Sequence, residues 1–200
     1  MSSTPEKTLL IWDIDDVLNT LMQQYVAYGL PENAKKLSYK ELTENPPHDL
    51  LGISKEDYLF SLDRVRAGRF YDLPPRPEVM AFFDECGHLF DHIVLSAVPV
   101  RFMEKSSAWV LHYFGDWIQS CLFIPSHRPD RDVKSQLFAS KAEAMKFFGP
   151  RAVLIDDSVK NVEETRSEGG RALYFPAPWN SEKDTGINAF LTSLKGLINE

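Results

Sequence analysis

The chain has 200 residues, and its 22 Lys and Arg residues against 29 Asp and Glu residues give a net charge of −7. A chain of this length buries roughly 70% of the surface that its unfolded form exposes, so we expect one sizeable core without disulfides or metal staples. An acidic chain without a run of basic residues is not expected to bind duplex nucleic acid, because that affinity depends on neutralising phosphates. The charge still allows a small phosphorylated ligand, because one metal ion reverses the sign of a site locally.

The sequence carries no signal for a membrane or for export. No apolar run approaches the 18 or more residues that a membrane span needs, and the N-terminal residues lack the basic and apolar regions of a signal peptide. The two cysteines, Cys86 and Cys121, form no CxxC pair and no zinc-type spacing. A reducing cytoplasm is therefore the expected compartment, and no pattern specifies an oligomeric state.

Five short apolar runs are typical of the strands of a buried parallel sheet. Helix-like stretches lie between the later runs, and strands that alternate with helices form βαβ units with right-handed crossovers. The expected fold class is therefore α/β, with a doubly wound, Rossmann-like parallel sheet. The five runs are residues 9–12, 93–95, 121–124, 152–155 and 172–175.

Local end signals place the helices around this sheet. Residues 77–86 begin with a proline and are followed by a glycine, which is typical of a helix with both ends marked. Ser140 and Glu143 form a capping box, which predicts a helix that begins at Lys141 and stops before a glycine. Two further helices are expected over residues 101–114 and 187–198.

One interval is too long for a simple βαβ unit. Asp13, after the first strand, and Ser96, after the second, are 83 positions apart, whereas a βαβ unit needs a few tens of residues. Apolar residues with helical spacing over 18–26, and Ser54 as the N-cap of a second helix, indicate that the extra segment is helical. We expect a core domain of residues 1–18 and 73–200, with a small helical cap, residues 19–72, inserted over the C-terminal edge of the sheet.

Polar side chains gather where three of the expected strands end. Ligands of an open α/β sheet bind outside the carboxyl ends of its strands, so these side chains are expected to converge. Like charges packed so closely are costly unless a cation joins them. Oxygen ligands suit a hard divalent ion, so the pattern predicts Mg²⁺ at this edge. The residues are Asp13, Asp15 and Asp16 after the first strand, Ser96 after the second, and Asp156, Asp157 and Asn161 after the fourth.

Four segments in this order resemble the motifs of the haloacid dehalogenase superfamily of phosphohydrolases. They are LLIWDIDDVLN, IVLSAVP, a lysine before the fourth strand, and VLIDDSVKNV. The resemblance implies that Asp13 attacks phosphorus and becomes an aspartyl phosphate, and that Asp15 protonates the leaving oxygen and then activates water. It also implies Mg²⁺ held by the side chains of Asp13 and Asp157 and the backbone carbonyl of Asp15. Asp156 and Asn161 are then outer partners that orient ligands or waters.

The same resemblance assigns the phosphate-binding residues. Ser96 donates a hydrogen bond to a phosphoryl oxygen, and a lysine pairs with Asp13 and the phosphate. Lys141 is favoured for that lysine because the capping box places it in the first turn of a helix, and Lys134 in the preceding loop is the rival. Lys105 is a secondary candidate for phosphate binding, with a solvated helix lysine as the alternative.

Three further segments, which are less specific than the catalytic motifs, resemble the 5'(3')-deoxyribonucleotidase-like group of that superfamily. The segments are RFYDLPPRPEVMAFF, SAVPVRFMEKSSAWVLHYFG and LYFPAPWN. This resemblance implies a small phosphorylated metabolite as the substrate, with a nucleoside monophosphate as the specific case. No duplex nucleic acid and no membrane is expected as a partner.

The cap carries aromatic and basic side chains with two possible uses. Aromatic side chains stack on a nucleobase or form the core of the cap, which is the more common use at helical spacing. The arginines of the cap either contact an anionic substrate or lie on a solvated helix face, and the second interpretation is favoured. The aromatic residues are Tyr25, Tyr28, Tyr58, Phe70 and Tyr71, and the arginines are Arg64, Arg66 and Arg69.

Three functions compete for this pattern. The first is an Mg²⁺-dependent phosphomonoester hydrolase. The second is a phosphorylatable signalling module of the receiver type, against which the 83-position interval argues. The third is a binding protein that keeps the fold without turnover, against which the intact Asp13, Asp15, Ser96 and Asp157 argue. We predict a hydrolase.

Overall fold

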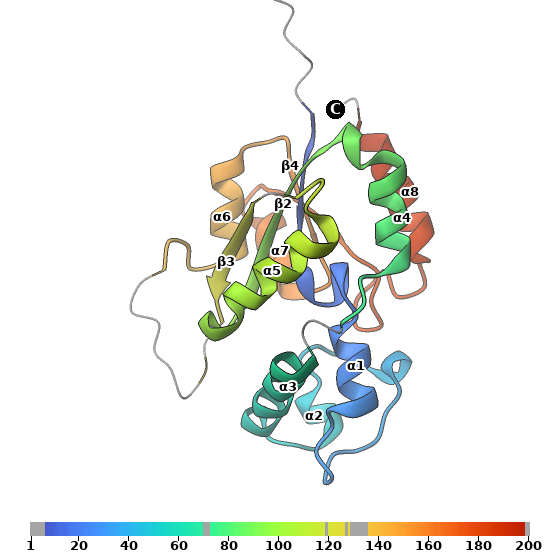
Figure 1. Ribbon diagram of the computed structural model, residues 1–200, viewed down its shortest axis with the longest axis vertical. Coiled ribbons are helices and arrows are strands. Elements are labelled where there is room, and N and C mark those ends of the chain that lie inside the picture. The colour runs from blue at the N-terminus through green and yellow to red at the C-terminus, as the bar shows by residue number, and fades with distance from the viewer. Residues whose placement is uncertain (1–6, 70–72, 119, 127, 129–135, 199–200) are drawn as a thin grey trace, which may run out of the picture.

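Five parallel strands form a single sheet in the computed structural model, which describes residues 7–69, 73–118, 120–126, 128 and 136–198. The strand order is β3-β2-β1-β4-β5, so the first strand lies at the centre (Figure 1). The predicted α/β class and parallel sheet are confirmed, and four of the five apolar runs lie within strands, whereas the fifth, residues 172–175, extends one residue beyond β5. The strands are β1 (Leu9–Trp12), β2 (Asp91–Val98), β3 (Cys121–Pro125), β4 (Ala152–Asp156) and β5 (Arg171–Tyr174).

The second strand extends further than the sequence indicates. β2 continues to Val98 because its last residues pair with β3, with Ser96 opposite Phe123 and Val98 opposite Pro125. Ser96 was expected after the strand, but it lies two residues before the end of β2. It is still near the carboxyl end of the sheet, where its hydroxyl faces the end of β1.

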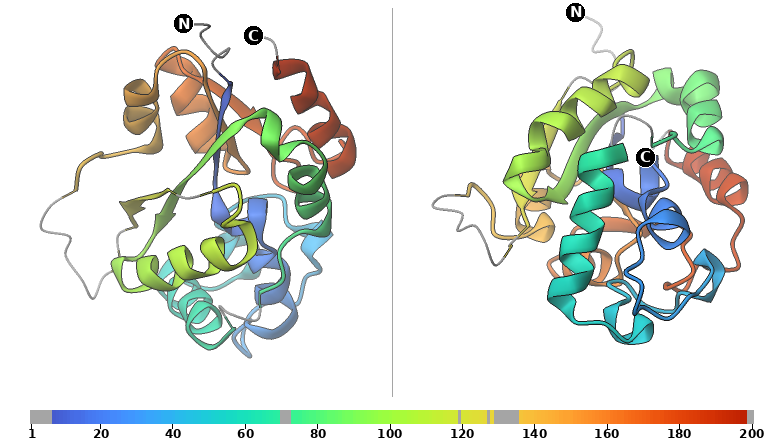
Figure 2. Two further views of the ribbon diagram at one scale, coloured as in Figure 1. Left: turned by 45° about the horizontal axis from the view of Figure 1, so that its top comes forward. Right: turned by 60° about the horizontal axis from the view of Figure 1, so that its bottom comes forward.

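Helices cover both faces of the sheet (Figure 2). Successive strand residues point to opposite faces, so Trp12 and Val94 belong to one buried cluster, and Ile11 and Leu95 to another. Because both faces are buried, the strands are apolar throughout rather than alternating. The first cluster packs against α4 (Pro77–Cys86), α5 (Met103–Phe114) and α8 (Ile187–Leu194), and the second against α6 (Lys141–Phe148) and α7 (Val159–Ser167).

Three further helices lie beyond the carboxyl edge of the sheet, at the bottom of Figure 1. They belong to the segment expected as a cap, and Tyr25 and Tyr58 pack edge to face in its interior with ring centroids 5.5 Å apart. The chain enters and leaves this segment at one place, because Asn19 and Pro75 form an antiparallel bridge. The three helices are α1 (Leu21–Tyr28), α2 (His48–Leu51) and α3 (Lys55–Arg69).

The ends of the helices follow the local signals closely. Ser54 caps α3 by accepting a hydrogen bond from the Asp57 N–H at 3.0 Å. Two predicted helices are shorter at one end, because 3₁₀ turns replace the first turn of residues 101–114 and the last turn of residues 187–198. Within the described part of the chain, no helix combines the length and the apolar character needed to cross a membrane.

Candidate active site

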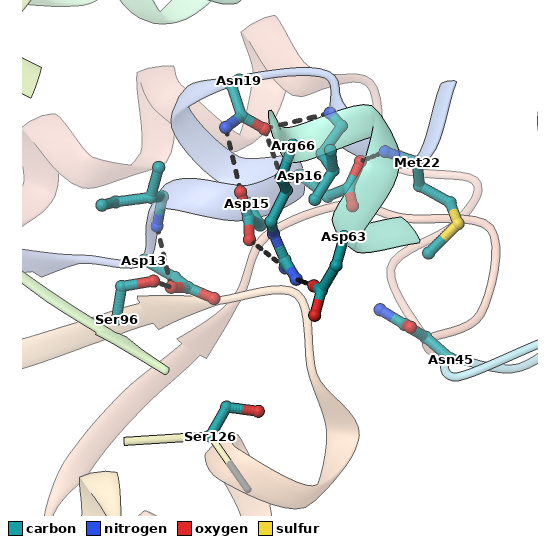
Figure 3. A network of polar contacts seen from close by, with 12 residues as sticks. Asp13, Asp15, Asp16, Asn19, Met22, Asn45, Asp63, Arg66, Ser96 and Ser126 are labelled. Atoms are coloured by element: carbon teal, nitrogen blue, oxygen red, sulfur yellow. Dashed lines mark hydrogen bonds and ion pairs between the residues drawn. The ribbon is translucent and has the colours of Figure 1, made fainter. Parts of the chain in front are cut away.

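Asp13 follows β1 directly, and three donors hold its carboxylate, of which Figure 3 shows Ser96. The oxygen Oδ1 accepts hydrogen bonds from the Ile14 N–H at 2.8 Å and from the Ser96 hydroxyl at 2.5 Å. Lys141 Nζ lies 2.9 Å from the same oxygen. Burial raises the pKa of Asp13 to about 6, although Lys141 opposes the rise. Among the described residues these contacts all end on Oδ1, which leaves Oδ2 for another group.

Lys141 is the buried cation of the site. Its side chain is 2% exposed, and Nζ also lies 2.6 Å from Asp156 Oδ2. Burial disfavours its charge, but the Asp13 and Asp156 carboxylates raise the pKa of Lys141 above its usual value. The expected capping box fixes its position, because Ser140 Oγ accepts a hydrogen bond from the Glu143 N–H at 3.1 Å. Lys141 thus lies against Asp13, whereas the rival Lys134 is outside the described residues.

Asp156 and Asp157, at the end of β4, complete a buried acidic cluster with Asp13. Asp156 accepts hydrogen bonds from the Ser158 N–H at 2.9 Å and from Asn161 Nδ2 at 3.1 Å. Burial, and then the neighbouring acid Asp156, raise the pKa of Asp157 well above its usual value. A carboxylate that burial and like charges both disfavour needs a nearby cation to stay ionised.

The geometry of this cluster fits a metal ion. One carboxylate oxygen from each of Asp13, Asp156 and Asp157 lies within 4.8 Å of the others. Within the described chain, Lys141 is the one cation that pairs with this cluster, and it contacts Asp13 and Asp156 but not Asp157. Three carboxylates facing one ammonium group leave the cluster with an excess of negative charge. All the ligand atoms are oxygens, which suits a hard divalent ion such as Mg²⁺.

Two residues of the LYFPAPWN segment, for which the sequence indicated no role at this site, hold Asp157 in place. Trp179 Nε1 donates a hydrogen bond to Asp157 Oδ2 at 2.9 Å, and Asn180 Nδ2 donates to its backbone carbonyl at 3.0 Å. Both belong to the PAPWN segment after β5, which lies next to β4 in the sheet. From the cap side, Asn45 Nδ2 lies 3.2 Å from Asp157 Oδ2. These donors orient the carboxylate toward the cluster.

Asp15 has both of its carboxylate oxygens engaged. Oδ1 accepts a hydrogen bond from Asn19 Nδ2 at 3.0 Å, and Oδ2 accepts one from the guanidinium of Arg66 at 2.5 Å. Arg66 comes from α3, so the cap segment reaches the core at this point (Figure 3). The favoured expectation for Arg66, a solvated helix face, is wrong, because the residue is only 6% exposed. Arg64, by contrast, is exposed as expected.

A second carboxylate of the cap, Asp63, ties the same helix to the core. It accepts hydrogen bonds from Arg66 at 3.0 Å, Arg101 at 2.8 Å and Arg128 at 2.7 Å. Arg101 follows β2 and Arg128 follows β3, so two core loops meet the cap at one residue. Despite burial, the guanidinium groups of Arg128 and Arg66 lower the pKa of Asp63.

Asp16 has a structural role that its place in the acidic run does not reveal. It has a left-handed backbone with φ of 62°, and its side chain accepts a hydrogen bond from the Met22 N–H at 2.9 Å. It therefore caps the first turn of α1 in place of Thr20, which makes no side-chain cap. Burial raises the pKa of Asp16 to about 7, against the effect of Arg76.

A cavity of about 150 Å³ joins the core cluster to the cap. Of the three described aromatic residues proposed for base stacking, only Tyr58 lines it, whereas Tyr25 is fully buried and Tyr28 is 66% exposed. Lys105 is half-buried on α5 and does not line the cavity. Phe70 and Tyr71 lie outside the described residues, as does the side chain of Arg69. The lining includes Asp13, Asp15, Asn45, Arg66, Ser96 and Asp157.

A larger hollow lies elsewhere, along α1 and α3. It has a volume of about 510 Å³ and is lined by Tyr28, Phe60 and Arg64 among others. It contains none of the clustered carboxylates. The candidate site is therefore placed at the smaller cavity, because Asp13 and Asp157 of the cluster line that one.

Comparison with known proteins gives no match by sequence. No family model matches the chain, and no curated protein matches it either.

Comparison of structures does give matches. A haloacid dehalogenase-superfamily hydrolase of subfamily IA from Geobacter sulfurreducens is 13% identical with a TM-score of 0.52, and the match covers 97% of this chain and 100% of the other. A haloacid dehalogenase-like hydrolase from Xanthomonas campestris is 12% identical with a TM-score of 0.55, covering 96% of each chain. Protein Tyrosine Kinase A from Mycobacterium tuberculosis is 13% identical with a TM-score of 0.58, covering 86% of this chain and 84% of the other.

These matches establish the class of fold. The chain has the fold of the haloacid dehalogenase-like hydrolases, which the sequence motifs predicted. The solved structures include hydrolases and a protein named as a kinase, so the fold by itself does not decide the reaction. The reaction has to be argued from the residues of the site.

Proposed function

We propose that the protein is an Mg²⁺-dependent phosphomonoester hydrolase that acts on a small phosphorylated metabolite through an aspartyl phosphate at Asp13. The observation that carries this proposal is the arrangement around Asp13, where Ser96 and Lys141 hold Oδ1 and leave Oδ2 uncommitted. A carboxylate held on one oxygen is oriented for attack with the other. The fold shared with hydrolases supports the same reaction class.

The acidic cluster is the proposed metal site. Asp13 and Asp157 would hold Mg²⁺ with their side chains, together with the backbone carbonyl of Asp15. Asp156 is committed to Lys141 and Asn161, so its proposed role is to orient its neighbours. When bound, Mg²⁺ supplies positive charge that offsets the repulsion between the carboxylate of Asp13 and a phosphate dianion.

The chain's own groups account for both proposed steps. Asp13 Oδ2 forms a bond to phosphorus while the bond from phosphorus to the substrate oxygen breaks, and that oxygen takes a proton from Asp15. In the second step Asp15 takes a proton from water, whose oxygen attacks phosphorus and releases inorganic phosphate and the Asp13 carboxylate. Lys141 has three N–H donors, so one is left for a phosphoryl oxygen while the other two pair with Asp13 and Asp156. The Ser96 hydroxyl has a single proton, which would turn from Asp13 to a phosphoryl oxygen when substrate binds. Both donors would stabilise the charge that develops there.

The cavity argues for a small substrate. Its volume of about 150 Å³ is below the 300–1,000 Å³ that is usual for sites of drug-sized ligands. Tyr58 is the one described stacking candidate on its lining, and that ring is already packed against Tyr25. A nucleoside monophosphate stays a prediction from the sequence resemblance, and it belongs in the substrate panel as one class among several.

The test is hydrolysis of p-nitrophenyl phosphate by the purified protein. We expect turnover with Mg²⁺, loss of turnover with EDTA, and a loss of at least about 10³-fold in Asp13→Asn, which removes the nucleophile. Asp91→Asn is the matched control, because Asp91 is exposed at the opposite end of the sheet. Full activity of Asp13→Asn would contradict the proposal. Acquisition of a stable phosphoryl group without turnover would favour the signalling alternative, and neither reaction would favour a binding protein.

A further inference from the structure

Arg66 is a buried arginine that carries more hydrogen-bond donors than the structure uses. Its guanidinium donates to Asp15 and Asp63, which occupies two of five N–H groups. Within the described chain, Nε is buried and has no hydrogen-bond partner. Burying an unpaired donor is costly, and a residue that is 6% exposed cannot recover that cost from bulk water. Arg66 also lines the 150 Å³ cavity, so a shift of its side chain toward a bound ligand would bring an unused donor to that ligand.

The position of Arg66 relative to the proposed reaction indicates which part of a substrate it would meet. The phosphoryl group lies at Asp13, where Ser96 and Lys141 face it. The leaving oxygen lies at Asp15, which exchanges a proton with it. Arg66 bonds Asp15 rather than Asp13, so it lies on the side of the leaving group and not on that of the transferred phosphoryl group.

Resting on the proposed function, we propose that the substrate is a small phosphate monoester whose leaving group carries a carboxylate, and that Arg66 binds this carboxylate. Arg66 is then the residue of the cap that determines specificity. Its planar fork matches a carboxylate, and both of its partners in the structure are carboxylates. The cavity volume favours a short leaving group over a long one.

Arg66 can shift toward a ligand without leaving a buried carboxylate unpaired. Asp63 also accepts hydrogen bonds from Arg101 at 2.8 Å and from Arg128 at 2.7 Å. Asp15 also keeps Asn19 at 3.0 Å. Removing one partner of an isolated buried ion pair is strongly destabilising, and the additional partners avoid that cost here.

The test compares two substrates that differ in one group. Phosphoglycolate is the smallest alkyl phosphate monoester with a carboxylate, and 2-hydroxyethyl phosphate replaces that carboxylate with a neutral alcohol. We expect kcat/KM of the unmodified protein to be at least about tenfold higher for phosphoglycolate, the amount that one charged hydrogen bond contributes. Equal kcat/KM values for the two compounds would overturn the proposal, and this comparison needs no variant.

Variants then assign the preference to Arg66. In Arg66→Gln, kcat/KM for phosphoglycolate is expected to fall until the two compounds are equal, whereas Arg64→Gln, exposed on the same helix, keeps the preference. An equal loss for both compounds in Arg66→Gln would show that Arg66 acts on what the two reactions share, the transferred phosphoryl group or Asp15, and not on the carboxylate, which overturns the proposal. Arg66→Lys keeps the charge and is expected to retain part of the preference.

A binding measurement separates this proposal from the proposed function. Calorimetry on Asp13→Asn with Mg²⁺ is expected to show tighter binding of phosphoglycolate than of 2-hydroxyethyl phosphate. Such a preference without any turnover in the unmodified protein would refute the hydrolase but support the carboxylate site. Turnover of both compounds without a binding preference would refute the carboxylate site and leave the hydrolase.

Discussion

Replacement of Lys141 by methionine tests the electrostatic core of the site. Lys141→Met keeps the length of the side chain but removes the ammonium group that lies 2.9 Å from Asp13 and 2.6 Å from Asp156. Breaking a buried ion pair by removing one partner costs about 3–5 kcal/mol, because the other charge stays buried without compensation. Asp156 keeps donors from Ser158 and Asn161, so we expect about 3 kcal/mol.

Urea unfolding measures this loss directly. With a slope of roughly 2 kcal/mol per molar urea, a loss of about 3 kcal/mol lowers the midpoint by about 1.5 M. The measurement is made in EDTA, so that no metal ion replaces the missing cation. The matched control is Lys146→Met on the same helix, whose side chain is 59% exposed and pairs with Glu168 at 2.9 Å. Such a surface pair contributes less than about 1 kcal/mol.

The pH dependence of the loss distinguishes an electrostatic cause from a packing defect. Burial already raises the pKa of Asp13 to about 6 while Lys141 lowers it, so the variant raises this pKa further. A carboxyl group with a raised folded-state pKa stabilises the fold below its unfolded-state pKa, and this stabilisation disappears as the pH rises through the folded-state value. The deficit of Lys141→Met is therefore largest at pH 8 and smaller at pH 5. An equal deficit at both pH values, or one no larger than that of Lys146→Met, would refute this reasoning.

Two further predictions concern stability. Burial lowers the pKa of His92 to about 4, so its contribution is complete above the unfolded-state value near 6.5 and decreases as the pH falls toward 4. Urea unfolding gives the free energy of unfolding of the unmodified protein and of His92→Gln at each pH. The difference between the two proteins should decrease by about 2 kcal/mol from pH 7 to pH 4.5. A difference that stays constant with pH would contradict this. Asp16→Asn keeps an acceptor for the Met22 N–H and tolerates a φ of 62°, so it should change stability by less than about 1 kcal/mol. Asp16→Val removes the helix cap and strains the backbone, so it should lose roughly 2–4 kcal/mol. Thermal unfolding of the two Asp16 variants checks this, and equal effects would argue against the backbone explanation.

The positions of the main site residues follow from local signals in the sequence. Apolar runs identify the strands, and parallel strands bring their carboxyl ends to one edge. Asp13 and Asp157 therefore meet although 144 positions separate them. Lys141 was favoured over Lys134 because a capping box fixes its place in a first helical turn. Each of these inferences needs only the residues within one strand or helix, together with the rule that parallel strands end at the same edge of the sheet.

The contacts between the cap and the core were not predicted, because they depend on where α3 lies over the sheet. The pairing of Arg66 with Asp15 joins residues 51 positions apart on two different layers. One signal was nevertheless present, because Arg66 continues the helical spacing of Tyr58 and Leu62, both of which are buried. An arginine on the apolar face of a helix needs a buried partner. Helical spacing therefore indicated burial, but it did not identify Asp15 as the partner.

The position of Trp179 is a second contact that the sequence did not reveal. The PAPWN segment follows β5, and only the order of strands places it beside Asp157. Strand order depends on pairing between distant segments, which no local pattern specifies. The same dependence on pairing explains why Ser96 was placed after β2 rather than within it.

The most direct test of the account is to identify the group that becomes phosphorylated. The protein is mixed with Mg²⁺ and p-nitrophenyl phosphate, quenched in acid within the first turnover and reduced with borohydride, which converts an aspartyl phosphate to homoserine. Mass spectrometry of the peptides then shows which residue reacted. The account predicts homoserine at position 13 and none in Asp13→Asn. Reduction at Asp15 or Asp157, or turnover without any reduced residue, would contradict the claim that Asp13 is the nucleophile.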